Sequence, residues 1–215
     1  MERILCLGDL VGYGADPALC LSLIRERAAA VVAGNHDYAV VGLTPLEFFN
    51  PYARAAAEWT ARELEHDDRS WLKGLPLTAT LGGATLVHAS PRNPEEWDYL
   101  FSAEDGEQAF PHFSTPLCFL GHSHVPGVWI HDGRSVSYRR GLSRIDLSPA
   151  CRYVMNVGSV GQPRDRDPRA SYAVWDEAEG WVEWVRVVYP IPITQQKIVR
   201  AGLPTFLAER LARGA

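Results

Sequence analysis

"RILCLGDLVGYGADPALCLSLIRERAAAVVAGNHD", residues 3–37, is the stretch that decides the fold. Its first apolar run, residues 3–7, stops at a Gly-Asp pair and predicts a buried strand. An Asp-Pro pair then predicts a helix over about 17–28, because Asp is a favourable N-cap and Pro a favourable first helical residue. A second apolar strand, residues 30–33, follows. Strand, helix and strand in this order predict a βαβ unit with parallel strands.

The rest of the chain is rich in predicted strands and hairpins. Regions with much Ala, Glu and Arg and with spaced apolar anchors favour helix, whereas β-rich runs joined by Gly pairs or Asp-Gly favour hairpins. We expect helices within 45–73, 94–113 and 204–215, hairpins at 77–90 and 127–138, and strands at 116–120, 153–160 and 171–188. This order predicts one α/β domain over residues 1–215, with two packed mixed β-sheets and helices outside them.

The bulk composition excludes several classes of protein. A formal net charge of −5 makes nucleic acid or an anionic membrane an unsuitable general partner. Four widely spaced cysteines without a CxxC pair indicate buried free thiols, not a disulfide framework. The apolar stretch at the start is too short for a signal peptide or a membrane span, so we expect a cytoplasmic protein.

Polar side chains follow four of the predicted apolar strands at the point where each strand ends. They are Asp9, Asn35–Asp37, His88, and the pair His122 and His124. In open α/β sheets ligands bind at the carboxyl ends of the strands, so we expect these side chains at one edge. A preceding glycine permits a sharp turn at three of these places, and alternate residues of an extended "GHSH" would put both imidazoles on one side.

Each of these features has an ordinary structural explanation when it stands by itself. A Gly-Asp or "GNHD" step is commonly a tight turn, "GHSH" could be a solvated loop, and a histidine at a strand end is commonly a satisfied core residue. Their joint occurrence favours a shared metal site. Carboxylate, amide oxygen and imidazole together suit Mn, Fe or Zn. His36, held by the neighbouring Asp37, could donate a proton to a leaving oxygen.

The same blocks resemble the signature of a known family. "GDLVGYGADP" (8–17), "GNHD" (34–37), "VHASP" (87–91) and "GHSH" (121–124) are similar to those of the calcineurin-like metallophosphoesterases. Residues 156–174 resemble the segment that follows in the bacterial phosphodiesterase branch, which is related to diadenosine tetraphosphatases. The resemblance implies a four-layer sandwich of two β-sheets flanked by helices.

The resemblance also implies a set of site residues and an activity. Two divalent ions, Mn, Fe or Zn, would share Asp9; Asn35, His88 and His122 would complete one site, His124 would belong to the other, and His36 would be the acid. A metal-bound hydroxide would then hydrolyse a phosphodiester in a small phosphorylated substrate. Dinucleoside polyphosphate hydrolysis and phosphoprotein dephosphorylation remain alternatives of the same class.

One block of the family pattern is absent from the sequence. The family begins with a strand carrying Asp-x-His and a helix, and no such block precedes Gly8. Because a catalytic ion usually has about three protein ligands, we expect one ion to bind well and the second weakly. One explanation is that the recorded start is late. The other is that the second site is lost and the protein is a non-catalytic binding protein. We favour the first, because a sheet without its first strand would have an unpaired, exposed edge.

Outside these blocks, the arginine-rich loop "QPRDRDPRA" contains Arg164, which could grip a substrate phosphate by forked hydrogen bonds. A solvated loop with self-cancelling charges is the other explanation. Tyr13 and Tyr99 could stack on a nucleobase, although packing is the more ordinary role of such side chains. The sequence does not indicate an oligomeric state.

Overall fold

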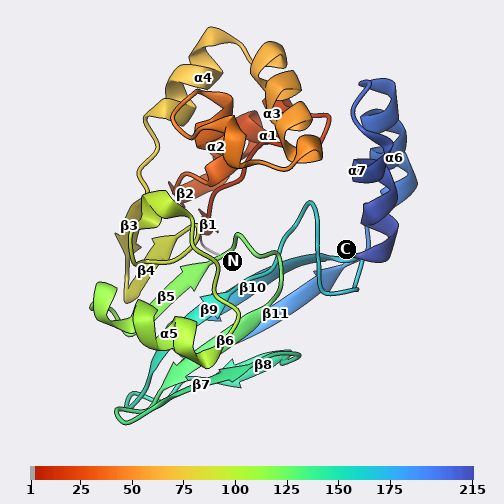
Figure 1. The fold of residues 1–215 in the computed structure, drawn as a ribbon. Coiled ribbons are helices and arrows are strands. Elements are labelled where there is room, and N and C mark those ends of the chain that lie inside the picture. Colours follow the sequence, from red (N-terminus) through yellow and green to blue (C-terminus); the bar gives the residue numbers. More distant parts are fainter. Residues whose placement is uncertain (1–2) are drawn as a thin grey trace. The chain divides into compact units, whose positions relative to one another are not determined.

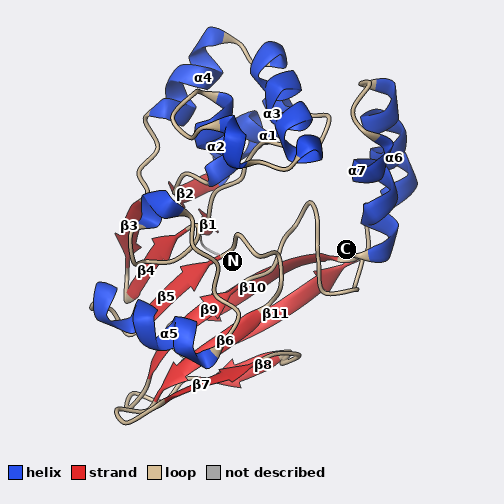
Figure 2. Cartoon of the chain, viewed as in Figure 1, coloured by secondary structure: helices blue, strands red, loops and turns tan. Residues whose placement is uncertain are grey.

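A computed structural model describes residues 3–215, which divide into two compact units. Unit 1 consists of residues 3–77 and Pro190–Arg213, and unit 2 of Thr78–Tyr189 with the last two residues. Helices make up most of unit 1, whereas strands predominate over helices in unit 2 (Figure 2). The expectation of one domain over residues 1–215 stays a prediction.

Unit 1 contains the βαβ motif, which confirms the first sequence prediction. Strands β1 and β2 are parallel and α1 connects them (Figure 1). The elements of unit 1 are β1 (Ile4–Cys6), α1 (Pro17–Arg27), β2 (Ala28–Val31), α2 (Asn35–Val40), η1 (Leu46–Phe48), α3 (Pro51–Glu63), α4 (His66–Lys73), α6 (Ile191–Arg200), α7 (Thr205–Glu209) and η4 (Arg210–Arg213).

Two apolar clusters hold unit 1 together. The first joins α1 and α3 through Leu21 and Ala57, both almost completely buried. The second packs α6 and α7 onto α3, with Ile198 and Leu207 against Ala56. Sequence reasoning missed α6, because its prolines and short apolar stripe resemble a loop, and packing against α3 supplies the missing stabilisation.

Unit 2 is built on a mixed sheet of six strands in the order β3-β4-β5-β9-β6-β7, with a second sheet of three strands in the order β10-β11-β8. Its elements are β3 (Thr78–Leu81), β4 (Ala84–Val87), η2 (Pro94–Glu96), α5 (Ala103–Ala109), η3 (Phe110–His112), β5 (Leu117–Leu120), β6 (Gly127–His131), β7 (Val136–Arg139), β8 (Arg144–Asp146), β9 (Arg152–Asn156), β10 (Ala170–Asp176) and β11 (Trp181–Val187). The hairpins predicted at 77–90 and 127–138 are confirmed, while β8 was not foreseen.

The two faces of the six-stranded sheet are covered differently. Helix α5 packs on one face, where a Cβ on Gly106 would lie 2.4 Å from the Trp129 ring (Figure 1). On the other face the three-stranded sheet meets it through Phe119 and Trp175, whose ring centroids are 5.6 Å apart. Unit 2 is therefore a helix-sheet-sheet stack, and the α/β class with two packed sheets is confirmed.

One detail of the predicted sheet was wrong. The strands before the four polar clusters do not share a sheet, because β1 and β2 form a two-stranded sheet while β4 and β5 are neighbours in the six-stranded one. Their polar ends are therefore positioned as two pairs, one in each unit. No helix within residues 3–215 combines the length and apolar character that crossing a bilayer requires.

The four cysteines are free thiols, as predicted. Cys118 is fully buried in β5, and burial raises the pKa of the Cys6 thiol to about 12. The other three differ from the predicted burial, because Cys6 and Cys151 are half-buried and Cys20 is exposed on α1.

Candidate metal centre

The carboxylate of Asp9 is held in a tight turn at the end of β1. Asp9 has a left-handed backbone, with φ of 54°, directly after Gly8 with φ of 87°. Its Oδ1 accepts a hydrogen bond of 3.0 Å from the backbone amide of His36. Non-glycine residues in this region are strained, and such strain is concentrated at functional sites.

Gly34 is required for a different reason than the sequence analysis supposed. Its φ is −101°, which any residue can adopt. A Cβ on Gly34 would however lie 2.1 Å from Oδ1 of Asp9 and 2.3 Å from its amide nitrogen. The absence of a side chain therefore lets the two loops approach closely, and it brings Asp9 beside Asn35 within unit 1.

Asn35 is the first residue of helix α2, so the tight-turn explanation of "GNHD" was wrong. Its side-chain Oδ1 is buried and has no hydrogen-bond partner among residues 3–215. An unsatisfied buried carbonyl oxygen is costly unless something else pairs with it. A cation ligated by this oxygen would remove that cost, so Asn35 fits a metal site.

His36 is enclosed by aromatic rings and backbone. Its side chain is 4% exposed, and its ring lies 4.4 Å from that of Tyr13 and 4.9 Å from that of Phe49. A Cβ on Gly12 would lie 2.5 Å from His36 Nδ1, so only glycine leaves room for the imidazole there. Tyr13 is therefore a packing partner of His36.

Asp37 anchors the loop that carries Asp9. Its carboxylate is completely buried and accepts backbone hydrogen bonds from Leu10 at 2.9 Å, Val11 at 3.2 Å and Gly34 at 2.8 Å. The sequence analysis gave Asp37 the task of holding the His36 ring. That task stays a prediction, and these bonds give Asp37 a further one, which is to tie the end of β1 to the start of α2.

We expect Asp37→Asn to lower the free energy of unfolding by about 1–3 kcal/mol, the cost of a buried amide left without an acceptor. Asn can still accept from Leu10 and Val11, but its NH₂ group would face the Gly34 N–H. Urea denaturation measures the change. The matched control is Asp132→Asn in an exposed turn, where a single oxygen accepts both amide bonds and the expected loss is below about 0.5 kcal/mol. Equal losses at the two positions would contradict the anchor role.

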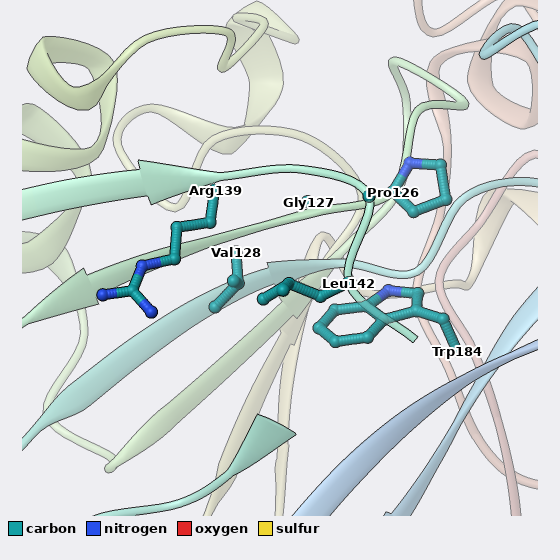
Figure 3. A pocket seen from close by; sticks show the side chains of 7 residues that line it. Pro126, Gly127, Val128, Arg139, Leu142 and Trp184 are labelled. Carbon is teal, nitrogen blue, oxygen red and sulfur yellow. The ribbon is translucent and has the colours of Figure 1, made fainter. Parts of the chain in front are cut away.

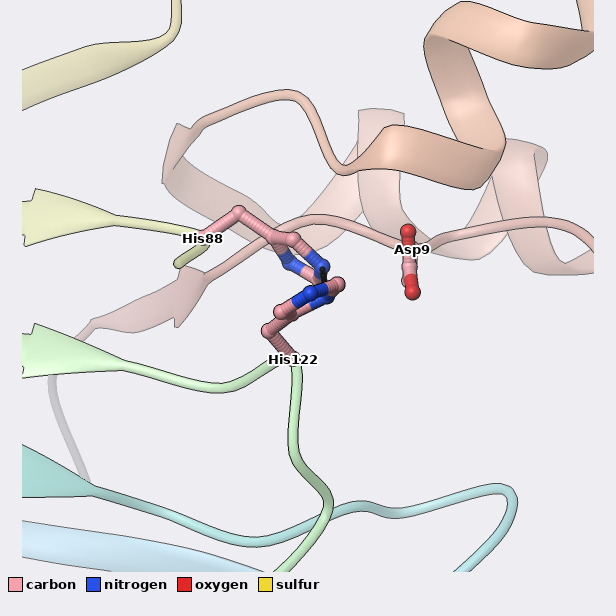
Figure 4. Close-up of side chains that lie close together, drawn as sticks. All are labelled: Asp9, His88 and His122. Carbon is pink, nitrogen blue, oxygen red and sulfur yellow. Dashed lines mark hydrogen bonds between the residues drawn. The ribbon is translucent and has the colours of Figure 1, made fainter. Parts of the chain in front are cut away.

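His88 and His122 form the corresponding pair in unit 2. They follow β4 and β5, which are parallel neighbours, and their side chains are 1% and 7% exposed. Nε2 of His88 lies 3.1 Å from Nδ1 of His122. The two rings lie edge-on, at 66° to each other, and Figure 4 shows their nitrogens directed toward each other. Two nitrogens bound to one tetrahedral Zn²⁺ would be roughly 3.3 Å apart, so this pair fits a shared cation.

His124 has its tautomer set by the backbone. Its Nδ1 donates a hydrogen bond of 2.6 Å to the carbonyl of Gln162, which leaves the Nε2 lone pair as the ligand atom. Metal-binding histidines commonly have such a partner on the other nitrogen. His122 and His124 both have positive φ, 59° and 61°, so the prediction of an extended "GHSH" was wrong. The segment bends because Ser123 N bonds back to Gly121 O at 2.7 Å.

Sequence reasoning missed Asn156, the residue that holds this loop in place. Asn156 ends β9 and is completely buried. Its amide nitrogen donates to the carbonyl of Gly121 and to the hydroxyl of Ser123, and its oxygen accepts from Gly158. The available signal was its position after an apolar strand, inside the segment that resembles the family.

Arg164 lies next to His124 within unit 2. Its backbone amide donates to His124 O at 3.2 Å, and its guanidinium donates to Gln162 Oε1 at 2.8 Å. Within the arginine-rich loop Arg169 pairs with Asp167, and this hydrogen bond holds the pKa of Asp167 down to about 2. Asp165 of the same loop pairs with Arg186 of β11. The self-cancelling explanation therefore applies to Arg169, and the phosphate-binding role of Arg164 stays a prediction.

Two hollows are present in unit 2. The smaller, about 150 Å³, is lined by Pro126, Val128, Leu142 and Trp184 (Figure 3). It contains none of the predicted ligands. The larger measures about 440 Å³ including open solvent, and Ser90 and Tyr99 are among its lining residues.

Histidines that suit a metal ion follow strands β4 and β5 of the mixed sheet in unit 2, and Asp9 and Asn35 follow the two parallel strands of unit 1. The chain matches the model of the calcineurin-like phosphoesterase superfamily domain over residues 1–180 and belongs to that superfamily.

Two relatives with at least 40% identity cover this chain completely. The crystal structure of a metallophosphoesterase from Sphaerobacter thermophilus is 42% identical, with a TM-score of 0.88 and 89% of that chain covered. The protein MJ0912 of Methanocaldococcus jannaschii is 40% identical over 218 residues, with 87% of its length covered. The protein PH1004 of Pyrococcus horikoshii, at 18% identity and a TM-score of 0.77, shares the fold.

Proposed function

We propose that the protein is a metal-dependent phosphoesterase that hydrolyses phosphodiester bonds in small phosphorylated molecules. The observation that carries the proposal is the buried pair of His88 and His122, with 3.1 Å between their ring nitrogens. Membership of the calcineurin-like phosphoesterase superfamily supports the same reaction class.

The proposed ligands are the residues that end the four strands. Asp9, His88 and His122 each offer one ligand atom, a carboxylate oxygen or an imidazole nitrogen, and Asn35 adds its buried amide oxygen. His124 would serve a second ion together with Asp9. When bound, divalent Mn, Fe or Zn supplies an activated water and neutralises charge on the phosphoryl oxygens.

The remaining steps belong to side chains of the protein. His36 donates a proton to the leaving oxygen, and its aromatic enclosure by Tyr13 and Phe49 keeps that proton from exchanging freely with bulk water. Arg164 donates to a phosphate oxygen and is oriented for this by Gln162. Asp37 and Asn156 keep the two ligand loops in place through their backbone bonds.

The test of this function is hydrolysis of a substrate panel in the presence of Mn²⁺. The panel contains bis(p-nitrophenyl) phosphate, a dinucleoside polyphosphate and a phosphopeptide. Preference for the diester supports the proposal, while preference for either other compound reassigns the substrate within the class. Absence of turnover on all three, with metal bound, would identify a binding protein and reject the proposed activity.

We expect the 215-residue chain to bind one ion tightly and a second weakly. Four of the proposed ligands serve the first ion, but only Asp9 and His124 serve the second, and a stable catalytic site usually has about three. Elemental analysis after dialysis should return close to one ion per chain. Two retained ions per chain would contradict this expectation.

A further inference from the structure

A short ladder of aromatic rings starts at His122 and continues outward. The Tyr99 ring stacks on the His122 imidazole with 4.0 Å between centroids and 21° between planes. Phe101 stacks in turn on Tyr99, at 5.4 Å and 12°. All three residues belong to unit 2, and the two aromatic residues lie on the segment between η2 and α5. A proposed metal ligand is thus continuous with an aromatic surface.

The outer part of this ladder is left exposed to solvent. Tyr99 is 48% exposed and Phe101 is 54% exposed, whereas Leu100 between them is 4% exposed and belongs to the core under α5. Alternate residues of an extended segment point to opposite sides, so burying Leu100 turns both aromatic rings outward. Packing is the role that the sequence favoured for Tyr99, and it explains the contact with His122. It does not explain why about half of the Tyr99 surface is exposed to solvent.

The larger hollow of unit 2 lies against the same ladder. Tyr99 lines it together with Arg92, Asp98 and Gln108. The Arg92 guanidinium is oriented by Asp98 at 3.0 Å and by Gln108 at 2.7 Å, and its side chain is 39% exposed. A guanidinium has five N–H donors, so Arg92 can pair with an anionic group in the hollow while its side chain is held.

We propose that the exposed part of the Tyr99–Phe101 stack receives the planar aromatic group of the substrate, either an aryl ring or a nucleobase, with Arg92 facing the anionic portion. This inference rests on the proposed phosphoesterase function and specifies the substrate class of that site. Stacking on an aromatic side chain tolerates many rings because each of them has a π-face. The protein should therefore discriminate aromatic from alkyl phosphoesters.

The experiment measures binding by isothermal titration calorimetry with Mn²⁺ present. Phenylphosphonate is compared with methylphosphonate, and adenosine 5′-monophosphate with ribose 5-phosphate. We expect the ring-bearing member of each pair to bind about 10-fold tighter, in line with the contribution of one stacked ring. A larger advantage in the second pair identifies a nucleobase as the natural group, and a larger advantage in the first identifies an aryl ring.

Variants of the ladder separate stacking from support of His122. We call the ratio of affinities between the ring-bearing and the ring-free member of a pair the ring advantage. Phe101→Ala removes the ring that does not touch His122 and should reduce the ring advantage several-fold. Tyr99→Phe keeps the stack and should retain the ring advantage. Phe206→Ala is the matched control, because Phe206 and Tyr52 form another exposed stacked pair in unit 1. It should leave the advantage unchanged.

Equal affinity within both pairs, or a ring advantage that survives Phe101→Ala, would overturn the inference. Hydrolysis of alkyl esters without any ring advantage would reject the aromatic site and leave the phosphoesterase function in place. A ring advantage that depends on Phe101, in a protein that hydrolyses none of the panel esters, would retain the aromatic site and reject the function.

Discussion

Replacing His88 with glutamine is expected to lower Mn²⁺ affinity by at least about 100-fold and phosphodiester hydrolysis by about 1,000-fold, since a bound ion supplies several kcal/mol of charge stabilisation. His88 is 1% exposed and shares a 3.1 Å contact with His122. Removal of one imidazole leaves the other without its counterpart in the ligand pair. Metal content by elemental analysis and diester turnover are the two measurements.

The control for this substitution is His112→Gln, which changes an exposed histidine in η3 of the same unit. Thermal unfolding of both variants without metal checks that the fold is retained. His88→Gln should then differ from the control in metal content, and its melting temperature should no longer rise when Mn²⁺ is added. Full metal occupancy in a folded His88→Gln protein would reject the ligand assignment.

Replacing His36 with glutamine is expected to have the second-largest effect, and the effect should depend on the leaving group. General acid catalysis typically contributes about 10²–10⁴-fold, and it matters most when the departing oxygen is basic. We therefore expect a loss in that range for an alkyl ester, and a much smaller loss for a p-nitrophenyl ester, whose leaving group departs without a proton. The kcat values of the two ester series measure the difference.

Metal content distinguishes this role from that of a ligand. His36→Gln should retain the metal content of the parent protein, whereas His88→Gln should not. His66→Gln is the control, because that imidazole is 86% exposed and should leave both ester series unchanged. An equal loss for alkyl and p-nitrophenyl esters would contradict a proton-donating role for His36.

Much of the fold could be predicted because its signals are local. The apolar run before Gly8 and the Asp-Pro pair at residues 16–17 predicted the βαβ unit, and the Asp132-Gly133 turn predicted the β6–β7 hairpin. Elements whose stability comes from distant packing were missed. β8 has only three residues and pairs with β11, and α6 depends on its contact with Ala56 of α3.

The site divides in the same way between local and distant information. The sequence indicated which residue types follow the strands. Within each unit the structure brings together Asp9 with the start of α2, and His88 with His122. The sequence predicted an extended backbone at His122 and His124, whereas the structure has a left-handed one. A left-handed bend depends on the hydrogen bonds around it, which the residue pattern does not reveal. An extended strand requires only the alternating pattern.

The sequence by itself determined the family, the βαβ start and the identity of the proposed ligands, because each is written in a few neighbouring residues. Only the tertiary structure decided that Asp37 bonds the loop amides of Leu10 and Val11, that Asn156 holds Gly121, and that Tyr99 stacks on His122. These partners are more than 20 residues apart in sequence. Long-range contacts depend on how the strands pair and the core packs, and no short pattern specifies that.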